Sequence, residues 1–316
     1  MKKNDFYIGI DIGGTNTVIG LVDIKGNYLA QKTMPTYAHE PVDVFLANME
    51  NEIDRLLNSH KNDLKGIGIG APSVNNKLGL VESPKNFNWG RIDLAQMIST
   101  KYQLPVKMIN DADAAALGEM YFGIARDLQN FVHITLGTGL GSSIIVNRKI
   151  LNGQSGFAGE LGHTKVHGSQ RICSCGKTGC LETYVSANGI RRTAFELLCL
   201  EREDSLLRDY PFNQLSPEII TNLALQGDRL AIETYAYTGK ILGEKLADVV
   251  AFLNPEAIVF SGGITKAGDL LFEPAQKAME QNLLPIHKNT VEIRISRPDK
   301  NYAVLGSAAL LMENNN

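Results

Sequence analysis

One pattern occurs twice in this chain of 316 residues and limits its fold more than any other feature. Residues 7–12 are mostly apolar, residues 13–16 read Gly-Gly-Thr-Asn, and residues 17–23 are again rich in strand-forming side chains. The same order of strand, Gly/Thr turn and strand returns at residues 131–146. Two such hairpins at separate places in one chain indicate an internal duplication.

Helices alternate with further short apolar runs. In residues 42–57 the apolar side chains recur at spacings of three and four, which predicts an amphipathic helix. A strand at residues 106–109 is followed directly by an Ala-rich helix at residues 112–121. This alternation predicts an α/β fold.

The length suggests two domains, because a domain typically takes roughly 150 residues. No low-complexity linker marks the boundary. We expect an N-terminal α/β domain at residues 1–120 and a C-terminal α/β domain at residues 121–301. The last helix, at residues 302–313, is expected to pack back on the first domain.

Charge and hydropathy exclude several classes of partner. Lys and Arg number 31 against 34 Asp and Glu, so the net charge is -3, and no long basic run is present. Nucleic acids and anionic membranes attract concentrated positive charge, so neither is expected as a partner. No apolar run approaches the ~18 residues of a membrane span, and the first apolar segment contains Asp11. We therefore expect a cytoplasmic protein.

The Gly/Thr turns are suited to binding phosphate. Glycines leave room for a phosphate to approach the backbone N–H groups, and threonine adds a hydroxyl donor. A strand follows each turn where a dinucleotide-binding motif needs a helix, so the Rossmann interpretation fails. Gly176-Lys177-Thr178 is not a Walker A motif either, since Arg171 stands where its first glycine belongs.

Either turn alone is also compatible with a plain hairpin. The two matched turns and the later Ser261-Gly262-Gly263 together favour nucleotide binding. The candidate nucleotide-binding residues are Gly13, Gly14, Thr15, Gly137, Thr138, Gly139, Gly262 and Gly263.

Asp11 lies just before the first turn, in a segment that is otherwise apolar. A carboxylate beside phosphates is a natural ligand for Mg²⁺, which bridges phosphate oxygens and needs few protein ligands. The alternative is an aspartate that caps the turn. We expect Asp11 to bind Mg²⁺.

Three of the four cysteines are close together, with a histidine upstream: Cys173, Cys175, Cys180 and His163. Three thiolates and an imidazole form a closed tetrahedral set for a structural Zn²⁺. Disulfides are the alternative, but an odd number of clustered cysteines and a Cys-x-Cys pair disfavour them. Cys199 lies in an apolar helical run and is expected to be a buried core thiol.

Two glutamates flank the metal-binding segment: Glu160 and Glu182. Carboxylates on a loop that a metal holds in place suit the hydroxyls of a sugar, and the second nitrogen of His163 can donate to the same ligand. Both glutamates are alternatively solvated loop charges, above all Glu182.

Asn110-Asp111 stands where the strand at residues 106–109 meets the next helix, which is where ligands bind in α/β sheets. Asp111 is compatible with a helix cap. It is also the carboxylate that an alcohol needs as a base when it attacks a phosphate. The two roles do not exclude each other.

Together these segments resemble the ROK family of repressors, open reading frames and kinases, and within it the bacterial glucokinases. The resemblance extends over nearly the whole chain and is carried by Ile8–Asn16, Asn110–Glu119, Leu136–Gly141, Gly159–His163, Cys173–Glu182 and Ser261–Gly263. It implies an actin-like, ribonuclease H-like ATPase fold of two domains with ATP and sugar in a central cleft.

The resemblance also implies roles for individual residues. Asp111 corresponds to the catalytic base, and the sugar contacts correspond to Asn86, Asn110, Glu160, His163 and Glu182. A homodimer is implied as well. Residues 71–75, Ala-Pro-Ser-Val-Asn, depart from the Gly-containing sugar loop that is commoner in the family, so the preferred hexose is not defined.

We therefore expect a kinase that uses ATP and Mg²⁺ to phosphorylate a hexose hydroxyl, with glucose 6-phosphate as the product. A kinase for N-acetylglucosamine or N-acetylmannosamine is the first alternative. A sugar-sensing regulator is the second, but the family's repressors carry a winged-helix module before the first phosphate strand, and only ten residues precede Asp11 here.

Overall fold

The computed structural model describes residues 5–57, 63–82, 87–297 and 299–312. The chain forms two compact units: the first comprises residues 1–129, 143–159 and 296–316, and the second comprises residues 130–142 and 160–295. We expected a single boundary near residue 120, but the chain passes between the units after residues 129, 142, 159 and 295. Contacts between distant segments decide this division, and local sequence does not encode them.

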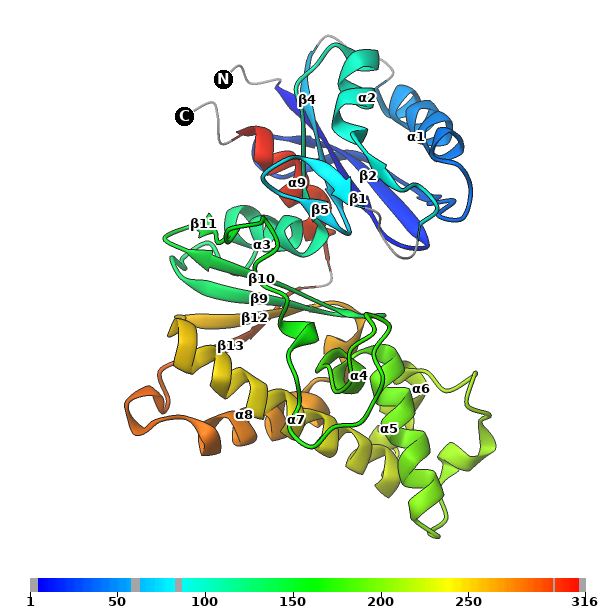
Figure 1. Ribbon diagram of the computed structural model, residues 1–316, viewed down its shortest axis with the longest axis vertical. Helices are drawn as coiled ribbons and strands as arrows, with labels where there is room; N and C mark the ends of the chain where they lie inside the picture. The colour runs from blue at the N-terminus through cyan, green and yellow to red at the C-terminus, as the bar shows by residue number, and fades with distance from the viewer. Residues whose placement is uncertain (1–4, 58–62, 83–86, 298, 313–316) are drawn as a thin grey trace. The chain divides into compact units, whose positions relative to one another are not determined.

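The first unit is built on a five-stranded sheet (Figure 1). Its strands, in spatial order, are β3 (Tyr28–Pro35), β2 (Asn16–Asp23), β1 (Phe6–Ile12), β4 (Leu64–Ala71) and β8 (Val106–Asn110). The β1–β2–β3 part is an antiparallel meander, whereas β1, β4 and β8 are parallel. The carboxyl ends of these three parallel strands therefore lie at one edge of the sheet.

The described residues of this unit form the helices α1 (Val42–Leu57), α2 (Leu94–Tyr102), α3 (Asp111–Phe122) and α9 (Tyr302–Met312). The apolar side of α1 is buried as its spacing predicts, with Phe45, Met49 and Ile53 fully inaccessible. A small sheet of β5 (Val74–Asn75), β6 (Leu80–Glu82) and β7 (Arg91–Ile92) completes the unit.

The last helix, α9, packs against β1, β4 and α3. Glycines make this close approach feasible. A Cβ atom at Gly9 would lie 2.0 Å from the carbonyl oxygen of Val304, and one at Gly68 would lie 1.8 Å from that of Ser307. Any side chain at these positions would push α9 away, so α9 is an integral part of the first unit.

A second five-stranded sheet has the spatial order β11 (Lys149–Ile150), β10 (Leu140–Val146), β9 (Phe131–Leu136), β12 (Ala257–Ser261) and β13 (Glu292–Ile295). β9, β12 and β13 are parallel. In both sheets three strands that are consecutive in sequence form one side, and two parallel strands follow. The shared order matches the duplication that the sequence predicts.

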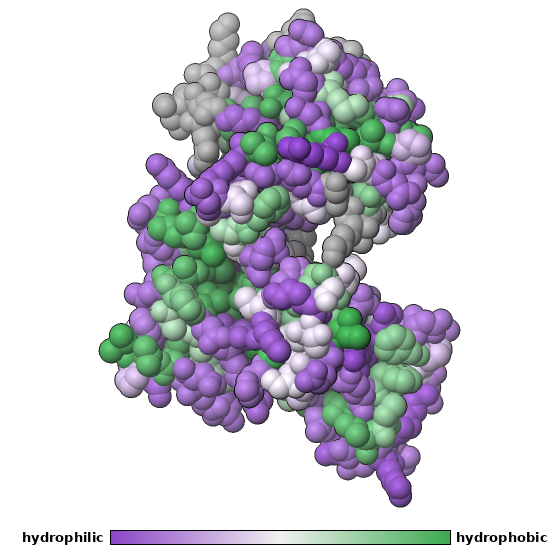
Figure 2. All heavy atoms as spheres, in the orientation of Figure 1, coloured by the Kyte–Doolittle hydropathy of each residue, from purple (hydrophilic) through white to green (hydrophobic). Residues whose placement is uncertain are grey.

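The remaining helices lie in the second unit: α4 (Glu182–Val185), α5 (Ala187–Leu200), α6 (Pro217–Leu225), α7 (Arg229–Leu253) and α8 (Asp269–Asn282). Hydrophilic residues cover much of the face shown in Figure 2. Among the described residues, no helix is both long enough and apolar enough to cross a bilayer.

Candidate active site

Three polar side chains lie at the carboxyl edge of the first sheet. Asp11 is near the end of β1, Asn110 ends β8, and Asp111 begins α3. Strand β4 lies between β1 and β8 and brings their carboxyl ends close, because Asp11 pairs with Gly70 of β4 and the next residue of β4 pairs with Asn110. The structure therefore places the expected base and the expected Mg²⁺ ligand in one neighbourhood.

Asp111 combines a helix-capping bond with an unused oxygen. Its Oδ1 accepts from the backbone N–H of Ala112 at 2.9 Å, and the side chain of Asn110 accepts from the same group at 2.9 Å. The backbone N–H of Asp111 itself also donates to this carboxylate, and among the described residues no other residue donates to Oδ2. Burial, and next the charge of Asp11, raise the pKa of Asp111 to about 6. One oxygen is thus left to take a proton near neutral pH.

Asp11 is held by a residue that the sequence reading did not select. The side-chain amide of Asn301 donates to Oδ2 of Asp11 at 3.1 Å, and the carbonyl oxygen of the same amide accepts from the N–H of Val304 at the start of α9. Burial raises the pKa of Asp11, because its Asn301 bond offsets only part of the desolvation. A nearby divalent cation is the natural stabiliser of such a carboxylate, so Asp11 fits a Mg²⁺ ligand.

Asn76 fixes the backbone beside Asp111. Its Oδ1 accepts from the backbone N–H of Asn110 at 2.8 Å, and its Nδ2 donates to Asp113 at 2.5 Å and to Asn152 at 3.1 Å. Ser143 also donates to Asp113, which is buried. The only local signal was an asparagine just after a short apolar strand, and these bonds span 34 to 76 positions, so the sequence did not reveal them.

The first Gly/Thr turn, residues 13–16, is braced by hydroxyl groups. Gly13 N–H donates to the Asn16 carbonyl at 3.0 Å, and Thr36 at the end of β3 donates its hydroxyl to the Gly13 carbonyl at 2.7 Å. The buried hydroxyl of Thr17 lies 2.9 Å from that of Thr36. A Cβ at Gly14 would meet nothing within 4 Å, so the protein's own packing does not require glycine there. Thr15 is exposed at the same turn.

The second Gly/Thr turn, residues 137–140, is braced by a carboxylate. Oε2 of Glu182 accepts from the backbone N–H of Leu140 at 2.9 Å, and a Cβ at Gly139 would lie 2.6 Å from that oxygen. Glu182 is therefore not a solvated loop charge, which corrects that alternative. Gly137 has open space where a Cβ would be, and Thr138 is exposed.

The third glycine pair, Gly262-Gly263, follows β12. Gly262 has φ +95°, and a Cβ there would lie 2.2 Å from the Leu136 carbonyl, so the fold itself requires glycine. Gly263 begins a short 3-10 helix and has no neighbour within 4 Å of its Cβ position. Open space at this glycine, as at Gly14 and Gly137, is what a ligand lying on the backbone needs.

The cysteine cluster, consisting of His163, Cys173, Cys175 and Cys180, is formed in the second unit. One ligand atom from each residue lies within 4.8 Å of all the others, and none of the cysteines is in a disulfide. The sulfurs of Cys175 and Cys180 are 3.6 Å apart. A tetrahedral zinc with Zn–S bonds of ~2.3 Å separates its sulfurs by about 3.8 Å, so the residues fit this metal.

The orientation of His163 assigns its two nitrogens. Nδ1 lies 3.8 Å from the sulfur of Cys173, whereas Nε2 lies 3.9 Å from a carboxylate oxygen of Glu160. Nδ1 is therefore the nitrogen that faces the cluster, and Nε2 faces away from it. The Glu160 side chain is 62% exposed, so it is accessible to a ligand.

The loop that carries the cluster is anchored by Arg171, which the sequence reading used only to reject a Walker A motif. Its side chain is 5% exposed, donates to the Thr183 carbonyl at 2.7 Å and pairs with Glu196 at 2.5 Å. Its guanidinium lies 4.0 Å from the ring centre of Tyr184. These contacts fix the loop to α4 and α5.

Two expectations from the sequence are not confirmed: one concerns a residue outside the described ranges, and the other is wrong. Asn86, an expected sugar contact, lies outside the described residues. Cys199, expected in the core, is exposed. It lies near the end of α5, between the buried Leu198 and the exposed Leu200.

Comparison with known proteins agrees with this geometry. Residues 7–314 match the model of the ROK family. The chain is 35% identical to the glucokinase of Halalkalibacterium halodurans over 317 aligned residues, covering 98% of this chain and 96% of that protein. The protein therefore belongs to the ROK family, and the resemblance seen in its motifs is confirmed.

Solved structures of the family include both enzymes and regulators. A ROK family glucokinase from Streptomyces griseus, in complex with glucose and AMPPNP, aligns with TM-score 0.83 and 29% identity over 98% of this chain and 99% of that one. A ROK family transcriptional regulator, described as a homologue of the E. coli MLC protein, aligns with TM-score 0.88 and 28% identity over 98% and 78% of the two chains. The predicted actin-like ATPase fold is confirmed, but the fold alone does not separate enzyme from regulator.

Proposed function

We propose that this protein is an ATP-dependent sugar kinase that phosphorylates a hexose hydroxyl, with glucose as the substrate and glucose 6-phosphate as the product. The observation that carries the proposal is the carboxylate of Asp111, which begins α3 at the end of β8, is buried beside Asp11, and accepts at Oδ2 from no other residue of the described chain. The near-full-length similarity to a glucokinase supports the choice of substrate.

The chemical step needs one base. Asp111 accepts the proton of the sugar hydroxyl as the oxygen forms a bond to the γ-phosphorus of ATP. The bond between that phosphorus and the β–γ bridging oxygen breaks, and ADP leaves with the electron pair. With its pKa near 6, Asp111 is largely deprotonated at pH 7 and able to accept this proton.

The nucleotide phosphates are assigned to the glycine turns. Gly13, Gly14 and Thr15 in the first unit, and Gly137, Thr138 and Gly139 in the second, present backbone N–H and hydroxyl donors. Gly262 and Gly263 are assigned to the nucleoside. The open Cβ positions at Gly14, Gly137 and Gly263 support these roles. Mg²⁺ held by Asp11 would neutralise phosphate charge.

The sugar hydroxyls are assigned to polar side chains of both units: Asn86, Asn110, Glu160, His163 and Glu182. Nε2 of His163 and the exposed Glu160 carboxylate support these roles, because both point away from the cysteine cluster. A structural Zn²⁺ bound by His163, Cys173, Cys175 and Cys180 would fix the orientation of the imidazole.

A sugar panel tests the proposal. Sugar-dependent ADP release is measured with glucose, N-acetylglucosamine and N-acetylmannosamine, and glucose is expected to give the highest kcat/KM. A preference for an acetamido sugar would assign the protein to the first alternative. No ADP release with any of the three would contradict the kinase function.

The structural similarity to a transcriptional regulator makes a sugar-sensing regulator the second candidate. A sensor needs sugar binding but no base, so the replacement of Asp111 by Asn would leave its response intact. Sugar binding without turnover would favour a sugar-sensing regulator over a sugar kinase.

We further infer a homodimer in the cytoplasm. The second unit exposes large apolar side chains, including Leu200, Leu225, Phe252 and Ile286, which are 72–90% accessible. Figure 2 shows apolar surface in the region of α5. Burial of such side chains between two copies supports a dimer, and light scattering after size-exclusion chromatography measures its mass. Reduced cysteines in the cluster suit the cytoplasm.

A further inference from the structure

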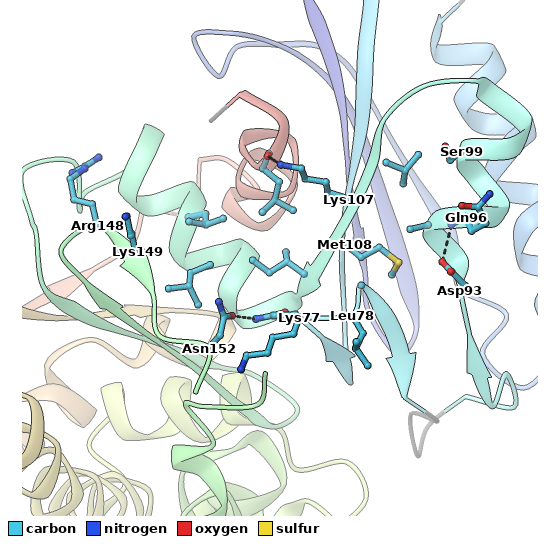
Figure 3. A pocket seen from close by; sticks show the side chains of 18 residues that line it. Lys77, Leu78, Asp93, Gln96, Ser99, Lys107, Met108, Arg148, Lys149 and Asn152 are labelled. Carbon is cyan, nitrogen blue, oxygen red and sulfur yellow. Dashed lines mark hydrogen bonds between the residues drawn. The ribbon is translucent and has the colours of Figure 1, made fainter. Parts of the chain in front are cut away.

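A pocket of about 620 Å³ lies within the first unit (Figure 3). Its walls come from the turn between β5 and β6, from α2, β8 and α9, and from the hairpin turn between β10 and β11. Neither Asp11, Asp111 nor either Gly/Thr turn lines it. The volume is typical of a small-molecule site.

The lining carries an excess of positive charge. Lys77, Lys107, Arg148 and Lys149 line the pocket, and Asp93 is the single acidic residue among the lining residues. Figure 3 shows Arg148 and Lys149 on one side, Gln96 and Asp93 on the other, and Lys107 between them.

Three of these cations donate to backbone carbonyls, and the guanidinium of Arg148 also lies 6.0 Å from the ring centre of Tyr121. Lys77 donates to the carbonyl of Gln154 at 2.5 Å, Lys107 to that of Leu310 at 3.0 Å, and Arg148 to that of Arg126 at 2.9 Å. Within the described part of the chain, no carboxylate forms an ion pair with any of the four. Carbonyl oxygens position a cation without neutralising it, so the pocket keeps its positive field.

The remaining lining residues suit the carbon skeleton of an organic ligand. Met108, Ile109 and Leu117 supply apolar surface, and the side-chain amide of Asn152, whose oxygen accepts from Asn76, supplies a polar group. A bare inorganic anion would leave this surface unused. The lining therefore suits a ligand that joins an anionic group to a polar carbon skeleton.

We propose that this pocket binds a small organic phosphate at a site distinct from the catalytic phosphates. Lys77, Lys107 and Lys149 bind the phosphate groups, Arg148 adds positive charge to the same wall while its guanidinium is held by the carbonyls of Arg126, Leu128 and Met120, and the apolar wall contacts the carbon skeleton. Asn76 belongs to this wall and also accepts the N–H of Asn110, so the bound ligand lies beside the strand that leads to the proposed base.

The test is calorimetric titration of the protein saturated with glucose and AMPPNP, so that the catalytic ligands are already in place. Fructose 1,6-bisphosphate is the probe, because its two phosphates can meet cations on different sides of the pocket. One site per chain is expected, and inorganic phosphate is expected to bind at least about 10-fold more weakly.

The variant pair Lys77→Gln with Lys149→Gln removes two charges that are exposed and therefore not needed for folding. It is expected to weaken probe binding at least about 10-fold while the Kd of AMPPNP stays unchanged. The matched control pair, Lys240→Gln with Lys277→Gln, removes the same charge from exposed positions of the second unit. No binding of either phosphate at millimolar concentration, or equal weakening in both variant pairs, would overturn the proposal.

Discussion

The two Gly/Thr turns have the same strand–turn–strand pattern but are braced by different chemistry. The first turn is fixed by neutral hydroxyls, since Thr36 donates to Gly13 and pairs with Thr17. The second turn is fixed by the carboxylate of Glu182, whose other oxygen lies 3.8 Å from the sulfur of Cys173. A duplicated motif thus kept its backbone while its supports diverged.

The different supports of the two turns indicate that the two units have different tasks. The first unit carries the proposed base on a rigid strand end and needs no metal for its own geometry. In the second unit the turn, the cysteine cluster and the proposed sugar contacts form one connected set, so disturbing the metal site is expected to reach the turn as well.

The largest expected effect is on the chemistry of the first unit. Asp111→Asn keeps the size of the side chain but removes the base, so kcat is expected to fall at least ~10²-fold while sugar and nucleotide still bind. Steady-state turnover and AMPPNP titration measure the two properties. Asp269→Asn, at an exposed position of α8, is the matched control. Near-normal turnover in Asp111→Asn would remove this residue from its role.

The second expected effect is loss of the metal from the second unit. Cys175→Ser is expected to lower zinc from about one per chain to near zero, because a structural site needs all four ligands. Sugar KM should then rise more than ATP KM. His163, a proposed sugar contact, is itself one of the metal ligands, whereas the cluster is connected to the second Gly/Thr turn through Glu182. Elemental analysis and kinetics are the measurements.

Cys199→Ser is the control for this variant, because Cys199 is exposed and lies outside the cluster. It should retain zinc and turnover. An equal rise in both KM values in Cys175→Ser would mean that the cluster only holds the fold together.

The pH dependence is expected to come from the first unit. A base acts when it is deprotonated, so kcat/KM should fall by about 10-fold per pH unit below the pKa of Asp111, which is near 6, and level off above it. For stability the sign is opposite. The folded state holds this proton more tightly than the unfolded state, so the wild type loses stability relative to Asp111→Asn as pH rises from about 4 to 6.

A kcat/KM profile from pH 5 to 8 and chemical unfolding of both proteins at pH 4 and 7 measure these effects. A profile that stays flat down to pH 5 would contradict a base with this pKa.

Glu182→Gln sharpens the comparison between the turns. Glutamine keeps the side chain's shape and can still accept from Leu140, so only part of the ~1.5–3 kcal/mol of a charge-assisted bond is lost and ATP KM is expected to rise by about 10-fold or less. Zinc content should not change. Sugar KM is expected to rise as well, because Glu182 is also an assigned sugar contact, and a rise in sugar KM with no change in ATP KM would show that Glu182 does not support the turn.

Local sequence was sufficient for the parts of the site that local structure forms. The Gly/Thr turns, the strand end at Asn110-Asp111 and the cysteine cluster depend on short-range patterns, and the structure has them where the sequence predicts. Asn301 was missed because its bond to Asp11 spans 290 positions. The edge strand β13 was missed because a run of only four residues is too short to give a clear periodic signal.

The smallest expected effect is at the support of the first turn. Thr36→Val keeps the shape but leaves the buried hydroxyl of Thr17 without an acceptor and frees the Gly13 carbonyl, which should cost ~1–3 kcal/mol in the free energy of unfolding. ATP KM is expected to rise only a few-fold, because the backbone bond from Thr36 to Thr15 remains. Thr33→Val, on the exposed side of the same strand, is the control. Chelator treatment of Thr36→Val should raise ATP KM by the same factor as in the wild type, since the two turns have separate supports. A larger factor would show that the first turn also depends on the metal.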